Sequence, residues 1–305
     1  MNETVSIVLI NWNQLEVTAA CLESLQRLTW RHTEVVVVDN GSTGNDADEI
    51  QRRFPWVVLV RNASNKGYTG GNNAGMRVAT GEWFLLLNND TIVEPGLLEP
   101  LLDAVRNEPD IGALSPKIRY FDDPNVIQYA GANDDVDMLL GRASWRGCGQ
   151  ADSGQFDEPT DTAIAHGAAF MVRRSVVEQV GTLWEDYFIY YEELDWSLRI
   201  RAAGWRIRYV PGSDVLHKES MSVGKHSPFK VYQQCRNRIW MVRRHGSLTE
   251  RAVFFAWVVM ASMPRNTLRH GMAGRLDLLK AQLSGTLAGL TAQQISGQTA
   301  LAVSL

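Results

Sequence analysis

Apolar runs and amphipathic stretches alternate along the first third of the chain. Four runs of five or six residues are typical of strands: Val5–Ile10, Glu34–Val38, Trp56–Val60 and Trp83–Leu87. Helices are expected between and after them, over Leu15–Leu28, Asp46–Phe54, Gly70–Ala79 and from Pro95, which suits a first helical turn. This alternation predicts an α/β fold with a doubly wound, mostly parallel sheet and right-handed crossovers.

The pattern is weaker beyond this point. Arg119–Ile164 is rich in Asp, Gly and Gln without clear periodicity, so we expect a long irregular excursion there. Arg206–Val210 is strand-like and is followed by a Pro-Gly turn, and Val231–Arg244 has the spacing of a helix.

The run Trp83–Leu87 lacks polar alternation, which is typical of a strand covered on both faces. Asn88, Asn89 and Asp90 follow it directly, so they are expected at the rim where open α/β sheets bind ligands. Their hard oxygen atoms suit Mg²⁺ or Mn²⁺ bridging a diphosphate. A polar turn at the end of a strand explains the same residues.

Two other segments point to the same rim. The topology places Asn11 and Asp39 near Asp90, and the carboxylate of Asp39 could accept the imide N–H of a uracil or thymine ring. An Asx-turn is the alternative for Asp39. Asn65–Gly75 holds four glycines and three asparagines before a helix, so its backbone N–H groups could approach an anion, unless it is only a flexible loop.

Composition narrows the classes of function. The chain has 305 residues, of which 45% are hydrophobic, as in one large globular domain or one domain with an appendage. A net charge of −4 gives no general attraction for nucleic acid, and neither GxxxxGK[ST] nor GxGxxG occurs where a nucleotide fold needs it. Three scattered cysteines indicate free thiols, and the first residues lack the features of a signal peptide, so we expect a cytoplasmic protein.

Three carboxylates lie within four residues at the expected start of a helix: Glu192, Glu193 and Asp195. Asp195 and Arg199 are i,i+4 neighbours, which favours an ion pair within the helix. Glu193 then points elsewhere, and neighbouring aromatic rings and acids should raise its pKa, as a general base requires. Acids that merely complement the helix dipole are the alternative.

In sequence order these features resemble the family 2 glycosyltransferases with a GT-A fold, most closely the bacterial rhamnosyltransferase-like branch. The resemblance is carried by Val5–Asn13, Val38–Ser42, Asn65–Gly75, Leu85–Asp90, His166–Arg173, Trp184–Arg201 and Val215–His217. It implies a catalytic domain over residues 1–245, with a nucleotide-binding half to about residue 118 and an acceptor half over 119–245. A helical appendage over residues 246–305 would follow.

The resemblance also implies the donor site. Asp39 would contact a pyrimidine and Asp90 would hold Mn²⁺ or Mg²⁺. The other residues expected to bind the nucleotide sugar are Asn11, Asn65, Gly67, Asn72, Asn89, His166 and Gly167. Asn88 replaces the usual first Asp of the metal motif, so we expect weaker metal affinity or another ligand. His217 is the candidate ligand, or else a hydrogen-bonded loop residue.

By the same resemblance, the reaction would be one in-line displacement with inversion. Glu193, where the family usually has Asp, would be the base, with Glu192 as the other candidate and Asp195 holding the helix. The expected acceptor residues are Trp184, Glu185 and Asp186. The donor would be dTDP-rhamnose or a UDP-sugar, and the acceptor a saccharide or lipid-linked saccharide of cell-surface polysaccharide synthesis.

The C-terminal part adds one more expectation. The apolar run Arg251–Met263 is too short to span a bilayer, and Arg265, Arg269 and Arg275 follow it. This pattern suits a helix at the inner face of an anionic cell membrane, or a helix packed on the catalytic domain.

Two other functions remain open. A non-catalytic carbohydrate-binding subunit of a polysaccharide assembly complex would explain the substitutions at Asn88 and Glu193. A sugar-nucleotide pyrophosphorylase would need a Gly-rich loop with Arg and Lys after the first strand, where this chain has Asn11–Gln14.

Overall fold

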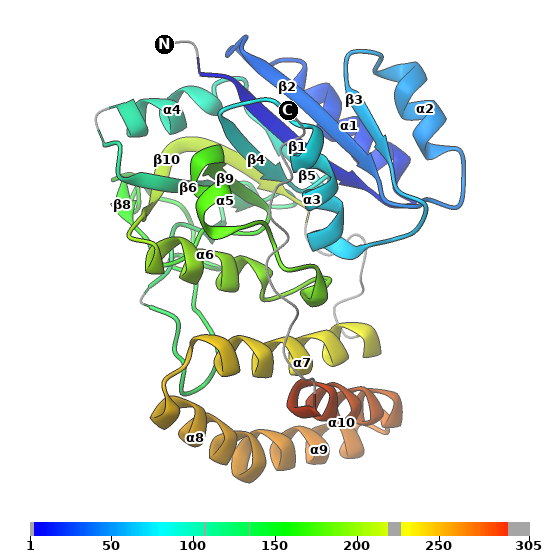
Figure 1. Cartoon of the computed structure of the whole chain (residues 1–305), viewed down its shortest axis with the longest axis vertical. Coiled ribbons are helices and arrows are strands. Elements are labelled where there is room, and N and C mark those ends of the chain that lie inside the picture. The colour runs from blue at the N-terminus through cyan, green and yellow to red at the C-terminus, as the bar shows by residue number, and fades with distance from the viewer. Residues whose placement is uncertain (1–2, 107, 134, 219–226, 292–305) are drawn as a thin grey trace.

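The computed structural model describes residues 3–106, 108–133, 135–218 and 227–291. Its centre is a ten-stranded mixed sheet in the order β3-β2-β1-β4-β9-β6-β10-β5, with β7 beside β6 and β8 beside β10. Helices cover both faces, and a layer of four further helices lies beneath (Figure 1).

The first half of the sheet is parallel, as the alternation predicts. Its strands are β1 (Val5–Asn11), β2 (Thr33–Asp39), β3 (Val58–Arg61) and β4 (Trp83–Leu87). The helices between them are α1 (Leu15–Leu25), α2 (Asp46–Arg53) and α3 (Gly67–Val78). Alternate strand residues enter two separate cores, so that Val37 packs with α1 and Val38 packs with α3. All five residues of β4 are buried, which confirms a strand covered on both faces.

The glycines of α3 serve a different purpose from the one expected. The helix begins at Gly67, three residues earlier than predicted, and Gly70, Gly71 and Gly75 lie inside it. A Cβ atom on Gly71 would lie 2.8 Å from Ile10 Cδ1, and one on Gly75 would overlap Val8. These two glycines therefore let α3 pack tightly on β1, instead of exposing N–H groups to a ligand.

The second half of the sheet is mixed. It contains β5 (Thr91–Val93), β6 (Ile111–Tyr120), β9 (Ala169–Arg173) and β10 (Arg206–His217). Strand β9 is antiparallel to both β4 and β6. The remaining helices of this half are α4 (Leu98–Arg106), α5 (Arg174–Val180), the 3₁₀ turn η1 (Glu185–Tyr187) and α6 (Glu192–Ala202).

Strand β10 departs from the prediction, because the expected turn at Pro211 is absent. The strand continues to His217 with a bulge between Val210 and Asp214, which accommodates a residue without a backbone N–H. Its last residues pair with β5, so that His217 lies opposite Thr91. The bulge therefore carries His217 back to the rim where Asp90 lies.

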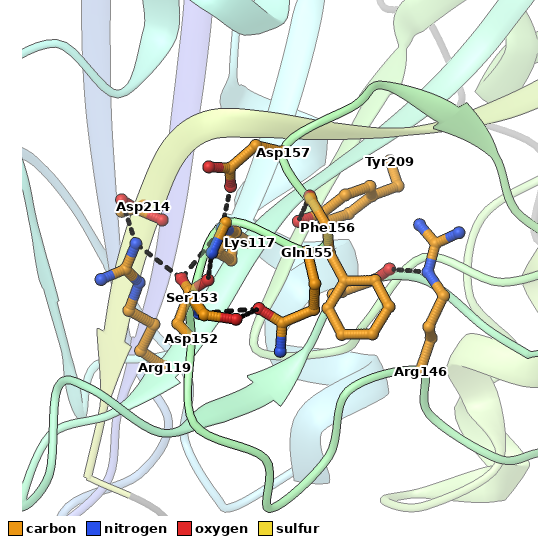
Figure 2. Close-up of polar contacts among 12 residues, drawn as sticks. Lys117, Arg119, Arg146, Asp152, Ser153, Gln155, Phe156, Asp157, Tyr209 and Asp214 are labelled. Atoms are coloured by element: carbon orange, nitrogen blue, oxygen red, sulfur yellow. Dashed lines mark hydrogen bonds and ion pairs between the residues drawn. The ribbon is translucent and has the colours of Figure 1, made fainter.

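The excursion after β6 is largely irregular, as expected, with short strands β7 (Ile127–Tyr129) and β8 (Thr160–Asp161). An ion cluster fastens it to the sheet (Figure 2). Lys117 of β6 is 2% exposed, and its Nζ lies 2.9 Å from Asp152 and 2.5 Å from Asp157. Arg119 bridges Asp152 as well, at 2.9 Å. Buried charges require such partners.

The lower layer holds α7 (Pro228–His245), α8 (Leu248–Trp257), the π-helical turn η2 (Val258–Ser262), α9 (Met263–Met272) and α10 (Leu276–Thr291). Gly289 of α10 packs against Ile239 of α7, where a Cβ would come within 2.9 Å of the isoleucine. Among the described helices, none combines the length and the apolar character needed to cross a bilayer.

Candidate functional site

A cavity of about 460 Å³ opens at the carboxyl ends of β1 and β4. Of the residues expected to bind a nucleotide sugar, five line it: Asn65, Gly67, Asn72, Asn89 and Asp90. The start of α3, the segment before α6 and the start of α7 close the other sides with Tyr68, Phe188 and Phe229. The rim of the sheet therefore carries a cavity, as expected for an open α/β fold.

Asp39 and Asn11 are not among the lining residues of this cavity, although their chain neighbours Asn40 and Ile10 are. Asn11 is completely buried, and its Nδ2 atom donates to Asp39 at 3.2 Å and to Asp46 at 3.0 Å, while its Oδ1 atom accepts from Thr18. Because both ends of this amide are bound by protein, Asn11 orients Asp39 and has no group left for a ligand. The lining residue here is Asn40, which our sequence analysis did not single out.

The loop between β3 and α3 is fixed by hydrogen bonds. Asn40 Nδ2 donates to Asn65 Oδ1 at 3.1 Å and to the carbonyl of Gly67 at 3.0 Å. Gly67 has φ +70°, and a Cβ atom there would lie 2.5 Å from Phe188 Cγ. Only glycine tolerates both this conformation and this close approach. The loop is therefore shaped before any ligand arrives.

Asp90 and His217 form an acceptor pair at the rim. Asp90 Oδ1 lies 3.2 Å from His217 Nε2, and both side chains are buried. Gln128 Oε1 lies 2.8 Å from His217 Nδ1, and a hydrogen bond donated from Nδ1 to Gln128 leaves Nε2 to face Asp90 as an acceptor. Among the described residues, no hydrogen-bond donor satisfies Asp90 Oδ1. Two facing acceptors fit a cation between them.

This pair matches the chemistry expected for a divalent ion. A carboxylate oxygen and an imidazole nitrogen suit Mn²⁺, and the hydrogen bond from Nδ1 to Gln128 is the outer contact that orients a metal-binding histidine. Within the described residues, no third acidic, histidine or cysteine side chain joins the pair. The remaining ligands would therefore have to come from a substrate, as diphosphate oxygens do.

His166 and Gly167 lie next to this pair. The rings of His166 and His217 are 6.3 Å apart between centroids. Burial, followed by the charge of His217, lowers the pKa of His166 to about 3, so its ring is neutral. The carbonyl of Gly167 accepts a hydrogen bond of 2.6 Å from the hydroxyl of Tyr68, a cavity residue. The two residues thus connect the rim with helix α6.

Glu192 and Glu193 lie beyond Tyr68, outside the lining of the cavity. Burial raises the pKa of Glu193 to about 7. Burial and then the charge of Glu193 raise the pKa of Glu192 well above its ordinary range. One carboxyl oxygen of each has no hydrogen-bond partner among the described residues. A Cβ on Gly167 would contact the Cβ of Glu193 at 3.8 Å, so this acid lies beside the expected sugar pocket.

Asp195 has a structural environment. It is completely buried and lies 2.9 Å from Arg199 and 2.7 Å from His245 of α7. Burial favours the neutral carboxyl, but the hydrogen bond from His245 and the charge of Arg199 outweigh it and lower the pKa of Asp195. The predicted ion pair is present. Since both oxygens are bound and inaccessible, Asp195 holds the helix and does not reach a substrate.

The three expected acceptor residues differ in accessibility. Glu185 and Asp186 are exposed at η1. The ring of Trp184, in contrast, contacts the guanidinium groups of Arg199 and Arg244 and stacks with Tyr187. With cations against its ring, Trp184 is occupied by the protein, and the expectation that it stacks on a sugar has no support in this geometry.

Sequence analysis missed several residues of the site. Tyr68 belongs to the glycine-rich segment, and its aromatic side chain among small residues is the feature that could have identified it as a site residue. Gln128 lies in the irregular excursion, and only the pairing of β7 with β6 brings it to His217. His245 lies on α7, fifty residues from its partner Asp195, and no local pattern marks it.

Comparisons with known proteins identify the family. The family model described as "Glycosyl transferase family 2" matches residues 6–181. An N-acetylglucosaminyl-diphospho-decaprenol L-rhamnosyltransferase of Mycobacterium tuberculosis is 28% identical, over 92% of this chain and 100% of that protein. A low-salt glycan biosynthesis hexosyltransferase of Haloferax volcanii is 27% identical, over 78% of this chain and 75% of its own.

Solved structures share the fold. A mannosyltransferase from Pyrobaculum calidifontis, in complex with GDP-Man and Mn²⁺, has a TM-score of 0.60 at 17% identity and covers 95% of this chain and 87% of its own. GalNAc-T7 with UDP, GalNAc and Mn²⁺ has a TM-score of 0.61 at 18% identity and covers 87% of this chain and 57% of its own. The predicted GT-A fold is confirmed. Since the family model matches more than half of the chain, this protein is an enzyme of the family 2 glycosyltransferases.

Proposed function

We propose that the protein transfers a sugar from a nucleoside diphosphate to an acceptor hydroxyl in one displacement with inversion. The observation that carries this proposal is the facing pair Asp90 and His217, of which Asp90 lines a cavity whose size suits a nucleotide. Asp90, His217 and the donor's diphosphate would hold Mn²⁺ or Mg²⁺. The ion, when bound, neutralises the charge that grows on the leaving diphosphate.

The donor would lie along the rim of the sheet. Asp39, held by Asn11, would accept the imide N–H of a pyrimidine, and the fixed loop at Asn65 and Gly67 would border the ribose and diphosphate. His166 and Gly167 would flank the sugar, because they lie between the metal pair and Glu193.

Glu193 is the better of the two candidate bases. At neutral pH its carboxyl is partly ionised, because its pKa is about 7, whereas the higher pKa of Glu192 keeps that neighbour protonated. Glu193 would remove the proton as the acceptor oxygen attacks the anomeric carbon and the bond to the diphosphate breaks. A base poised near the working pH is the most effective.

The acceptor is proposed to be a lipid-linked saccharide. The M. tuberculosis relative is named for a diphospho-decaprenol acceptor and for rhamnose transfer. By that likeness we propose dTDP-rhamnose as the donor, with a UDP-sugar as the alternative, and cell-surface polysaccharide synthesis as the setting. A lipid-linked acceptor places the enzyme at the inner face of the cell membrane.

A donor screen tests this proposal. The protein is incubated with dTDP-rhamnose and a panel of UDP-sugars, with and without Mn²⁺, and both its melting temperature and transfer to a polyprenyl-diphosphate-linked N-acetylglucosamine are measured. We expect one donor to raise the melting temperature only with Mn²⁺. Asp90→Ala should remove this shift, whereas Glu193→Gln should keep it and lose about 10²–10⁴-fold in transfer rate. Unchanged transfer in both variants would refute the assignments.

Asn88 lies beside the proposed metal ligands. Its Nδ2 atom is 3.4 Å from His217 Nε2, and it supplies an uncharged amide where the family is expected to have a carboxylate. We therefore expect weaker binding of the ion than a second carboxylate would give.

A further inference from the structure

The segment immediately before α6 has an unusual backbone. Phe188, Tyr190 and Tyr191 have φ of 64°, 72° and 74°. Bulky residues other than glycine rarely occupy this left-handed region, and such conformations persist only where neighbouring groups hold them. The segment contributes Phe188 to the cavity and ends one residue before Glu192. Its shape therefore decides where both carboxylates point.

Asn237 of α7 is bound to this segment. Its side chain is completely buried, and its Nδ2 atom donates to the carbonyl oxygens of Tyr187 at 2.9 Å, Ile189 at 2.9 Å and Tyr190 at 2.8 Å. The two hydrogens of this amide are shared among three carbonyls, each of which directly precedes a residue with positive φ. An aspartate of the same size would offer none of these donors when ionised.

Arg236 fixes the orientation of that amide. Its Nε atom donates to Asn237 Oδ1 at 2.9 Å, which directs Nδ2 of Asn237 toward the carbonyls. Its Nη2 atom donates to the carbonyls of Asp186 at 2.8 Å and Tyr187 at 3.1 Å. The guanidinium lies 4.3 Å from the centroid of the Trp240 ring, which holds it in place.

We propose that Asn237, oriented by Arg236, is a positioning residue for sugar transfer: it keeps the segment before α6 in the conformation that aims Glu193 at the acceptor hydroxyl. This inference rests on the proposed function of Glu193. Asn237 is not a lining residue of the cavity, so it acts through the backbone. When the segment relaxes, the base is misplaced, and an error of about 1 Å costs on the order of 100-fold in rate.

The test compares Asn237→Asp and Arg236→Met with wild type. Hydrogen exchange of the peptide spanning residues 187–193 measures how firmly the segment is held. The kcat with dTDP-rhamnose and Mn²⁺ measures catalysis. We expect faster exchange in both variants and a kcat lower by about 10- to 100-fold, with the donor KM within about threefold. The exposed Gln234 on the same helix provides the control, since Gln234→Ala should change none of these values.

The two readouts separate the possible failures. Unchanged exchange in both variants, or faster exchange with unchanged kcat, overturns the positioning role. Faster exchange in an enzyme whose wild type transfers no sugar leaves the hydrogen-bonding role intact and refutes the proposed function instead. Should Asn237→Asp fail to fold, Arg236→Met still tests the proposal, because it retains the amide of Asn237 and removes the group that orients it, together with the hydrogen bonds to the carbonyls of Asp186 and Tyr187. A purely structural role would lower the melting temperature without lowering the kcat of the folded enzyme.

Discussion

At the scale of single residues, burial raises the pKa of two neighbouring carboxyls, those of Glu192 and Glu193. Glu192 is 5% exposed, and burial and then the charge of Glu193 raise its pKa well above the ordinary range, so the two carboxyls do not both ionise at neutral pH. The pair therefore titrates as a unit, with the charge residing on Glu193. That assignment makes predictions about both rate and stability.

The transfer rate should follow the ionisation of Glu193. A base acts as its carboxylate, so we expect kcat to rise about tenfold per pH unit below about 7 and to level off above it. Measurement of kcat from pH 5 to 9 checks this. A flat profile would argue against Glu193 as the base.

Folding stability should run the other way. Because the folded pKa of Glu193 is raised from 4.5 to about 7, its folded form binds more protons, and stability is lost as pH rises through that interval. We expect Glu193→Gln to gain stability relative to wild type between pH 5 and 8, by about 2 kcal/mol. Urea unfolding of both proteins at pH 5 and at pH 8 measures this gain. If the two proteins differ in stability by the same amount at both pH values, the raised pKa of Glu193 is contradicted.

Gln128 should matter for metal affinity. It fixes the Nδ1 proton of His217, so Gln128→Ala is expected to raise the Mn²⁺ concentration for half-maximal activity by about 10- to 100-fold. Titration of activity with Mn²⁺ checks this prediction. Gln150, exposed on the same excursion, is the control, and Gln150→Ala should leave the titration unchanged. An unaltered Mn²⁺ requirement in Gln128→Ala would separate Gln128 from the metal.

At the scale of elements, the buried cluster at Lys117 fastens the excursion to β6. Lys117→Met removes one of the two cations at 2.9 Å from Asp152, whose side chain is 6% exposed, and leaves it only Arg119. We expect a loss of about 3 kcal/mol in the free energy of unfolding. Denaturant unfolding measures it. Arg106→Ala, which removes an exposed ion pair with Asp103, should cost less than about 1 kcal/mol, and similar losses in both variants would contradict the prediction.

The elements that the sequence could predict are those with a strong local pattern. The strand Trp83–Leu87 matches β4 at both ends, and the other three early strands agree within two residues. Strands β6 and β9 were not predicted, because their residues occur in segments that local pattern alone does not distinguish. The continuation of β10 through Pro211 depends on pairing with β6 and β5, which no local pattern reveals.

The site residues that the sequence could predict are likewise those marked by a local pattern or by the family resemblance. Asp90 and its amides could be located because they end a predicted strand, and His217 through the family resemblance alone. Asn11 and Asp195 were predicted as site residues, and their burial and hydrogen bonds make them supports for Asp39 and α6. Gln128, His245 and Asn237 could not be found, because each acts through a contact between distant segments.

At the scale of the whole molecule, the lower layer presents an apolar and basic surface. Met260, Leu268 and Met272 are exposed to 74%, 63% and 81%. Residues 251–291 contain five arginines and lysines against one aspartate, in a chain whose net charge is −4. Apolar side chains among cations suit the interface of an anionic bilayer, which supports a location at the membrane surface.

Vesicle binding tests this surface. We expect the protein to sediment with vesicles of phosphatidylglycerol and not with pure phosphatidylcholine, and 0.5 M salt to weaken binding. Arg265→Glu with Arg269→Glu should reduce the partition coefficient by more than about tenfold, since each basic residue contributes about 1 kcal/mol. Arg31 is exposed in the N-terminal part of the chain, so Arg31→Glu should have little effect on vesicle binding. An equal loss of vesicle binding in Arg31→Glu and in the double variant would indicate that the attraction is not specific to this surface.

The late arrival of β9 at the centre of the sheet has a consequence for biosynthesis. Until residues 169–173 leave the ribosome, the edge of β4 carries unpaired N–H and C=O groups beside fully apolar side chains. At ordinary translation speed that interval lasts on the order of ten seconds. A nascent chain in this condition is a natural client for chaperones, and slow codons between Leu87 and Ala169 would lengthen its exposure to aggregation.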